Sequence, residues 1–363
     1  RPNPDSPITL SFAANAAVDQ PVRRFRPPDQ ALCVGGGHAI VGANALWRSF
    51  NAETGAPEEG PISVTDFFNL TGNFSDPGCI YDGSGTRRFF LSFFRFNEKS
   101  PSKFSHFVVA VSASSDPADG FIGPYIFPND GLDSAGKPLP GLEACAGSKD
   151  PGTGFVYEGG CLGDYPSVGL DAHSLWAGFN LFATEPREAY AGVLMLAIDK
   201  AGLVSGAAAT PAYAAYSNWD PELAYTVQPA VTQAGTPHDG RGGGSIYLTS
   251  SGPVSQNEPN QPLLAVWAAT RTDRLADPAF PSSGLPLISG AALLDVPAYA
   301  DPGVLDGERF CMPQPDPGVP LDAGDARTLQ SVWSGGLVWT AAQTVLRAGP
   351  AAPKAVGAVW WAV

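Results

Sequence analysis

A short phrase recurs five times along the chain, and it constrains the fold more than any other feature of the sequence. Each copy has a polar opening, a short apolar strand, a tight turn and a second apolar strand. The residues that open the copies are Asp29 with Gln30, then Asp76, Asp164, Gln228 and Gln330. Repetition of one several-stranded unit is typical of radial β architecture. The sequence therefore predicts an all-β fold, a β-propeller of five blades, with six blades as the alternative.

The composition agrees with many short strands that are joined by turns. The 363 residues include 42 Gly and 36 Pro, and only 15% of them are charged. We expect almost no helix and long loops between the strands. No stretch approaches the roughly 20 uninterrupted apolar residues that a membrane-spanning helix needs. Residues 1–26 are expected to be an N-terminal extension, a candidate for a ring-closing strand, and residues 27–363 a single propeller domain.

The charge balance narrows the class of partner. The chain has 21 basic and 35 acidic residues, which gives a formal net charge of -14. Such a surface repels the phosphate backbone of a nucleic acid, so we expect a glycan or an extracellular protein as partner. The alternative is that the acidity serves only to keep the protein soluble.

The five cysteines allow at most two disulfides within the chain. Cys145 and Cys161 bracket a Gly-rich loop that has no apolar periodicity of its own, and Cys33 and Cys79 occupy nearly the same place in the first two copies. We predict a bridge within each pair, with free buried thiols as the alternative. Cys311 is then unpaired or bonds to another chain.

Two glycosylation sequons begin at Asn69 and Asn73, just before the second copy. Together with the predicted disulfides they indicate an oxidising compartment, which places the protein outside the cell or on its surface. In a bacterium the sequons would carry no such meaning.

Several runs of the sequence resemble those of a family of secreted, largely uncharacterised β-propeller proteins. They are PPDQALCVG at 27–35, SDPGCIYD at 75–82, VSASSDP at 111–117, CLGDYPSVG at 161–169, VQPA at 227–230 and DARTLQ at 325–330. The resemblance extends from about residue 27 to the C-terminus, and Ser167 and Leu170 depart from its pattern. It implies a propeller fold and an extracellular setting, and it implies no particular reaction.

The polar openers are expected at equivalent positions, where they would form a ring around one mouth of the central channel. The members of this ring are Asp29, Gln30, Asp76, Asp164, Gln228 and Gln330. Carboxylate and carbonyl oxygens are the ligands that Ca²⁺ prefers, and close Asp side chains repel one another unless a cation or hydrogen bonds intervene. The sequence thus makes Ca²⁺ the candidate cofactor. The alternative is that these residues only begin strands and satisfy turns.

Two classes of function fit this ring. The first is a non-catalytic extracellular module that binds glycan or protein, as part of a cell-wall or surface assembly. The alternative is a glycoside hydrolase or polysaccharide lyase in which Asp29, Asp76 and Asp164 supply the carboxylates. No Glu stands at an opener position to serve as the usual acid, so the sequence favours the module and leans against an enzyme.

Aromatic residues outside the apolar strands are candidates for stacking against sugar rings. They are Tyr157, Tyr213, Tyr216, Trp219 and Tyr225. The tryptophans within the strands, among them Trp339 and Trp360, are expected to pack one blade against the next.

Overall fold

The computed structural model describes residues 11–15, 19, 29–97, 104–149, 156–157, 159–183, 190–207, 209, 211–216, 224–251, 261–277, 287–299, 311–312, 321–322, 324–347 and 354–363. Within these ranges the chain is mostly β. Antiparallel strands follow one another in groups, and each group begins at one of the polar openers or close to it. The expectation of an all-β chain is confirmed.

The first two groups are separate four-stranded sheets in chain order. The first sheet contains β1 (Gln30–Gly35), β2 (His38–Ala43), β3 (Leu46–Asn51) and β4 (Pro57–Ser63). The second contains β5 (Asn73–Tyr81), β6 (Phe89–Asn97), β7 (Phe104–Ser112) and β8 (Phe121–Pro128). The short helix α1 (Val64–Phe68) connects them.

The later groups belong to one continuous sheet, because their inner strands pair with each other. The third group contains β11 (Cys161–Leu170), β12 (Ser174–Ala183), β13 (Tyr190–Asp199) and β14 (Pro211–Tyr216), and helix α2 (Lys200–Ser205) follows β13. The fourth contains β15 (Gln228–Thr232), β16 (Ser245–Ser250), β17 (Gln261–Thr270), β18 (Leu287–Ile288) and β19 (Ala292–Tyr299). The last contains β22 (Thr328–Ser334), β23 (Leu337–Arg347) and β24 (Lys354–Ala362).

Two small hairpins and three 3₁₀ turns lie outside these groups. They are β9 (Ser148–Lys149) with β10 (Val156–Tyr157), β20 (Cys311–Met312) with β21 (Leu321–Asp322), and η2 (Pro117–Asp119), η3 (Glu143–Cys145) and η4 (Thr272–Arg274).

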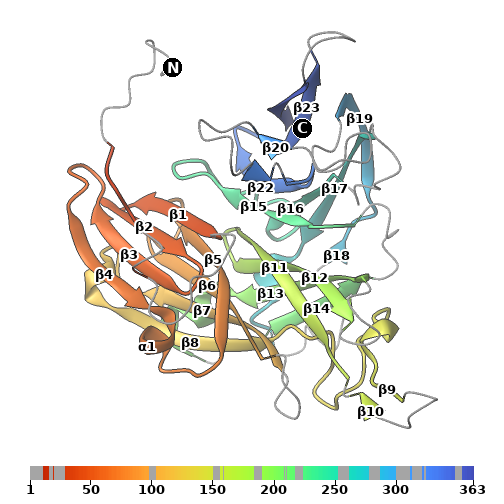
Figure 1. Cartoon of the computed structure of the whole chain (residues 1–363), viewed down its shortest axis with the longest axis horizontal. Helices are drawn as coiled ribbons and strands as arrows, with labels where there is room; N and C mark the ends of the chain where they lie inside the picture. Colours follow the sequence, from red (N-terminus) through yellow and green to blue (C-terminus); the bar gives the residue numbers. More distant parts are fainter. Residues whose placement is uncertain are drawn as a thin grey trace.

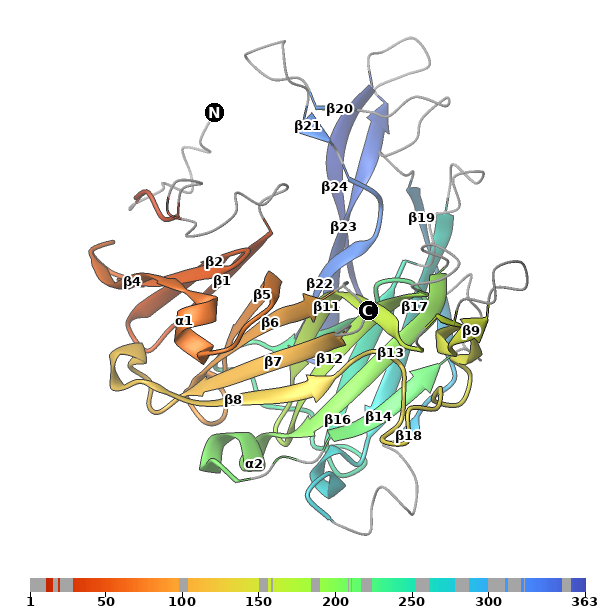
Figure 2. The ribbon, with the colours of Figure 1, turned by 60° about the horizontal axis from the view of Figure 1, so that its bottom comes forward.

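The groups fan out around an axis in a propeller-like arrangement (Figure 1). The first strand of each group lies nearest the axis, and the inner strands of the last three groups pair in parallel: Leu170 of β11 pairs with Val231 of β15, which in turn pairs with Val332 of β22. Figure 2 shows the sheets of the first half of the chain side by side, with the last group standing upright beside them. The openers of the groups are thereby brought to one end of the axis.

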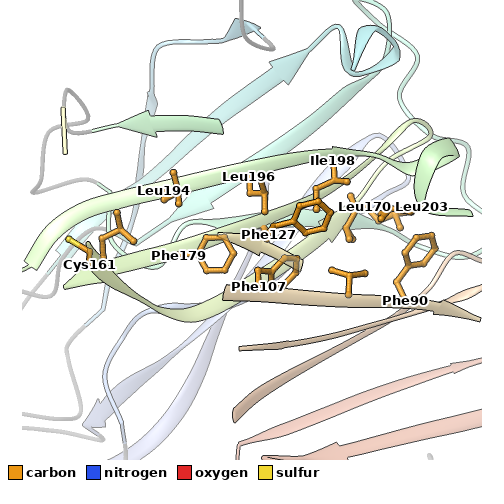
Figure 3. Close-up of a cluster of buried hydrophobic side chains, with 14 of the residues drawn as sticks. Phe90, Phe107, Phe127, Cys161, Leu170, Phe179, Leu194, Leu196, Ile198 and Leu203 are labelled. Atoms are coloured by element: carbon orange, nitrogen blue, oxygen red, sulfur yellow. The ribbon is translucent and has the colours of Figure 1, made fainter. Parts of the chain in front are cut away.

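Apolar clusters fill the spaces between consecutive groups. The second and third groups share a core of Phe107, Phe127, Phe179, Leu194, Leu196 and Ile198 (Figure 3). A second core joins Trp176 of the third group to Trp267 of the fourth. A third joins Tyr299 of the fourth group to Trp361 of the last. Burial of these large side chains is the main force that holds the groups together.

Both predicted disulfides are present. Cys33 of β1 is bonded to Cys79 of β5, with a Cα–Cα distance of 5.4 Å, so this bridge joins two neighbouring inner strands. Cys145 is bonded to Cys161 across 5.1 Å and closes the Gly-rich loop. The backbone of Cys311 lies in β20, and its side chain is outside the described residues.

The described part of the N-terminal extension lies on the first sheet. The Phe12 ring packs on Phe50 at 4.8 Å, and the Asn15 side chain donates a hydrogen bond to the carbonyl of Val41. Residues 11–15 form no strand there, and residues 1–10 are outside the described part, so a ring-closing strand stays a prediction.

The two sequon asparagines differ in their surroundings. Asn69 is exposed at the C-terminal end of α1, whereas Asn73 is half-buried at the start of β5. Their glycosylation stays a prediction. Among the described residues, no helix has both the length and the hydropathy that crossing a bilayer needs.

Candidate functional site

A cavity of about 330 Å³ lies at the end of the axis where the inner strands begin. Its lining includes five of the polar openers, Asp29, Gln30, Asp76, Gln228 and Gln330. The sixth, Asp164, lies next to Tyr165 in the lining, and its charge acts on Asp76. Every strand group therefore contributes a residue to this cavity or to its edge.

A β-bulge places Asp76 in the cavity. Ser75 pairs with Phe94 and Gly78 pairs with Ser92, so Asp76 and Pro77 together oppose a single residue of β6. The bulge puts Asp76 in the left-handed region, with φ at 47°. That region is costly for most residues and is tolerated best by Gly, Asn and Asp. Bulges often re-aim a side chain beside a functional site, and this one places the Asp76 carboxyl group in the lining of the cavity.

The same bulge recurs in β11, but it is shifted by one residue from the position that alignment of Asp164 with Asp76 predicts. Asp164 pairs with Asn180 and Ser167 with Gly178, so the extra residues are Tyr165, with φ at 54°, and Pro166. Tyr165 is thus the structural equivalent of Asp76, and Asp164 is the equivalent of Ser75. The expectation that the two Asp openers occupy equivalent positions is wrong by one residue. Alignment on the two prolines, which hold the same place in each bulge, would have given the correct register.

Hydrogen bonds connect the carboxyl groups of Asp29 and Asp76. Asp29 Oδ2 accepts hydrogen bonds from Asn44 Nδ2 at 2.7 Å and from the Ser75 hydroxyl at 3.0 Å. The Ser75 hydroxyl also lies 3.3 Å from Asp76 Oδ1, between the two acids. Ser75 therefore fixes their relative position from the strand residue that precedes the bulge.

The surroundings of Asp76 favour the protonated form of its carboxyl group. Burial raises its pKa to about 8, with further contributions from the negative charges of Asp164 and Asp29 and from a hydrogen bond with Asp29. Burial also raises the pKa of Asp164, and there the backbone N–H of Tyr165 and the charge of Arg327 oppose the rise. The site thus distinguishes two buried acids. The positive charge of Arg327 favours the ionised form of Asp164, whereas the negative charges near Asp76 favour its protonated form.

Arg327 forms the positive side of the cluster. Its Nε donates to Asp325 Oδ1 at 2.7 Å, and its Nη2 donates to Asp325 Oδ2 at 2.5 Å. The guanidinium lies 5.1 Å from the ring centroid of Tyr165 and 5.1 Å from that of Tyr225. Although burial works against the charge, the Asp325 carboxylate raises the pKa of Arg327, so the cation persists at any working pH.

The sequence reasoning missed Arg327, Asp325 and Tyr165 as parts of this site. A signal was available, since Asp325 and Arg327 fall in a run that resembles a family motif, and Tyr165 lies within CLGDYPSVG. The sequence feature that points to Asp325 and Arg327 is an Asp and an Arg two residues apart, directly before an inner strand.

The predicted Ca²⁺ site depends on how the polar openers are arranged around the cavity. In the described part of the chain, no group of three or more His, Cys, Asp or Glu side chains is arranged to hold a metal ion. The Gln228 amide donates to the Ser167 hydroxyl at 2.9 Å instead. Ca²⁺ at this cavity stays a prediction.

The predicted sugar-stacking residues lie mostly outside the described side chains. Tyr157, Tyr213 and Tyr216 are described in their backbone alone, and Trp219 is outside the described residues. Tyr225 is half-buried and packs on Tyr190 at 5.5 Å as well as on Arg327.

Comparison with known proteins finds similar chain paths among solved structures only. No family model matches the sequence, and no curated protein does. The catalytic domain of a GH62 α-L-arabinofuranosidase from Coprinopsis cinerea is 11% identical, with a TM-score of 0.38 over 91% of this chain and 89% of that one. An endo-1,5-α-L-arabinanase from Thermotoga petrophila is 13% identical, with a TM-score of 0.31 over 91% of this chain and 70% of that one. A neuraminidase-like N10 protein of a bat influenza A virus is 8% identical, with a TM-score of 0.36 over 92% of this chain and 79% of that one.

The prediction of a non-catalytic binding module, and with it the preference against an enzyme, requires correction. Several of the similar structures are glycoside hydrolases, which is the class of the catalytic alternative. A likeness at TM-scores below 0.4 carries no argument about activity, so the side chains must supply the reason. At Asp76, burial and two acidic neighbours raise the pKa to about 8, so an Asp there has the property for which the sequence argument required a Glu.

Proposed function

We propose that this chain is an extracellular glycoside hydrolase built on a five-bladed propeller, with its active site at the channel mouth. Five successive groups of antiparallel strands support the blade count, and two disulfides support the compartment. The observation that carries the reaction is the protonated Asp76 carboxyl beside Asp29 and Asp164 at the cavity.

Glycoside hydrolysis needs one carboxylic acid and one carboxylate on either side of the scissile bond. Asp76 is the acid, because its raised pKa keeps a proton available for the leaving oxygen near neutral pH. Asp164 is the carboxylate, because the Tyr165 N–H and Arg327 stabilise its negative charge. Asp29 acts on Asp76, since its charge and its hydrogen bond help to keep the proton there.

Arg327 is a positioning residue in this scheme. Its fixed place between two tyrosine rings holds a positive charge near Asp164, and this charge opposes the rise in the pKa of Asp164 that burial causes. The net charge of -14 favours a neutral glycan over an acidic one, which also disfavours the lyase alternative, because lyases act on uronic acid chains.

Release of reducing sugar from arabinan, arabinoxylan, xylan and barley β-glucan tests the proposal. The wild-type chain is expected to hydrolyse at least one of these neutral glycans, and Asp164→Asn is expected to lower the rate by about 10²- to 10⁴-fold. Asp295→Asn, which changes an exposed carboxylate on β19, is the matched control and should leave the rate unchanged. The proposal is wrong if no glycan of the panel is cleaved, or if Asp164→Asn cleaves as fast as the control.

A further inference from the structure

The last strand group has one buried face and one exposed aromatic face. Along β23 and β24 the residues Val338 and Trp361 are 3% and 6% exposed, whereas Trp339 and Trp360 are 39% and 65% exposed. The two exposed indole rings stack on each other, with centroids 5.7 Å apart and planes inclined by 24°. The expectation that strand tryptophans serve only to pack blades is wrong for this pair, because they lie on the face of the sheet turned away from its core.

Strand register connects this face to the cavity. Gln330 of β22 pairs with Ala341 of β23, which pairs with Trp360 of β24, and paired residues point to the same side of a sheet. Neighbouring strands are about 4.8 Å apart, so Trp360 lies about 10 Å along the sheet from Gln330. Gln330 lines the cavity, and the aromatic face therefore begins at the wall of the candidate active site.

The chemistry of this face suits a neutral sugar chain. One cross-strand row contains Gln330, Ala341 and Trp360, and the next contains Val332, Trp339 and Ala362, so no charged side chain stands in either row. An exposed indole offers a flat apolar surface that packs on the C–H face of a sugar ring. Exposed apolar surface of this kind on a soluble chain commonly marks a binding site.

We propose that Trp339 and Trp360 form an aromatic platform for the part of a neutral polysaccharide that extends from the carboxylate cavity along β22–β24. This inference rests on the proposed glycoside hydrolase function and adds the direction in which the substrate leaves the site. Stacking on Trp360, the more exposed ring, supplies affinity and leaves the chemical step at Asp76 and Asp164 untouched.

Affinity electrophoresis in gels that contain arabinan, arabinoxylan, xylan or β-glucan tests the platform by binding alone. The chain is used with Asp164→Asn, so that the glycan is not degraded during the run. Trp360→Ala is expected to weaken the retardation about tenfold, and Trp360→Phe, which keeps an aromatic face, should retain most of it. Leu293→Ala is the matched control, because Leu293 is 48% exposed on β19, outside the platform. Polygalacturonate should retard none of the variants, because its charge has the same sign as that of the protein.

Three results would overturn the platform. The first is that Trp360→Ala and Leu293→Ala are retarded equally in a gel that retards the Asp164→Asn chain. An Asp164→Asn chain that none of the neutral glycans retards counts as the same result. The second is acrylamide quenching that finds no accessible tryptophan lost in Trp360→Phe, which would mean that the face is covered in solution. The third is a dimer in sedimentation that Trp360→Ala dissociates, which would assign the face to a second copy.

The platform and the hydrolase can fail separately. Loss of retardation in Trp360→Ala without hydrolysis by the wild type would keep the sugar platform and refute the enzyme. Hydrolysis that depends on Asp164, with unchanged retardation in Trp360→Ala, would keep the enzyme and refute the platform.

Discussion

Replacing Asp76 by Asn is expected to lower kcat/KM by about 10²- to 10⁴-fold, because the variant keeps the shape of the side chain and loses the proton that the leaving oxygen needs. The substitution is well suited to this backbone. Asp76 has a φ of 47°, and Asn tolerates the left-handed region at least as well as Asp does. Exchange of one carboxyl oxygen for an amide nitrogen keeps the size of the side chain, and the remaining oxygen can accept the hydrogen bond from the Ser75 hydroxyl.

Asp295→Asn serves again as the matched control, since it makes the same chemical change on the exposed side of β19. Circular dichroism and the unfolding midpoint of both variants establish that each is folded. An Asp76→Asn enzyme with more than half of the wild-type kcat/KM would remove Asp76 from the role of acid.

The second large effect concerns stability and its dependence on pH. The pKa of Asp76 is about 8 in the folded chain, whereas an unfolded Asp has a pKa of about 3.9. Between these values the folded state holds a proton that the unfolded state has released, so the free energy of unfolding falls as pH rises. The slope from this one group is at most about 1.4 kcal/mol per pH unit, and the loss is complete above the folded pKa.

Asp76→Asn removes this dependence, because the amide is neutral at every pH. The variant should match the wild type near pH 4 and exceed it by several kcal/mol at pH 8. Urea unfolding of both proteins at pH 5, 6, 7 and 8 measures the difference, and the contributions of acids that do not interact with Asp76 cancel in the subtraction. Curves that stay parallel over this range would show that Asp76 is ionised in the folded protein at neutral pH.

The sequence was sufficient for those features that depend on pattern alone. Alternation of apolar residues and Gly-rich turns predicted the strands, and the matching places of Cys33 and Cys79 predicted a bridge between neighbouring inner strands. The convergence of the openers followed from the repeat, because parallel inner strands bring their first residues to one end of the axis.

The chemistry of the site could not be obtained in the same way. A bulge shifts the register of β5 and β11 by one residue, and the repeat pattern alone does not show which residue becomes the extra one. The raised pKa of Asp76 depends on burial and on two acids from other blades, and the support for Asp164 depends on Arg327 from the far end of the chain. Trp360 and Trp361 are adjacent in β24 and point to opposite faces of the sheet. The sequence does not show which of them is exposed, because only the packing of the last sheet distinguishes the two faces.

The pH dependence of kcat/KM on the glycan that is cleaved tests the central assignment most directly, because it reports the pKa of the essential acid in the free enzyme. The account predicts a falling alkaline limb with a midpoint at about pH 8, where Asp76 loses its proton. Asp29→Asn should move that midpoint to lower pH, because it removes a negative charge and a hydrogen bond that both raise the pKa of Asp76. A rate that stays constant through pH 10, or an alkaline limb that Asp29→Asn leaves in place, would contradict the assignment of Asp76 as the acid.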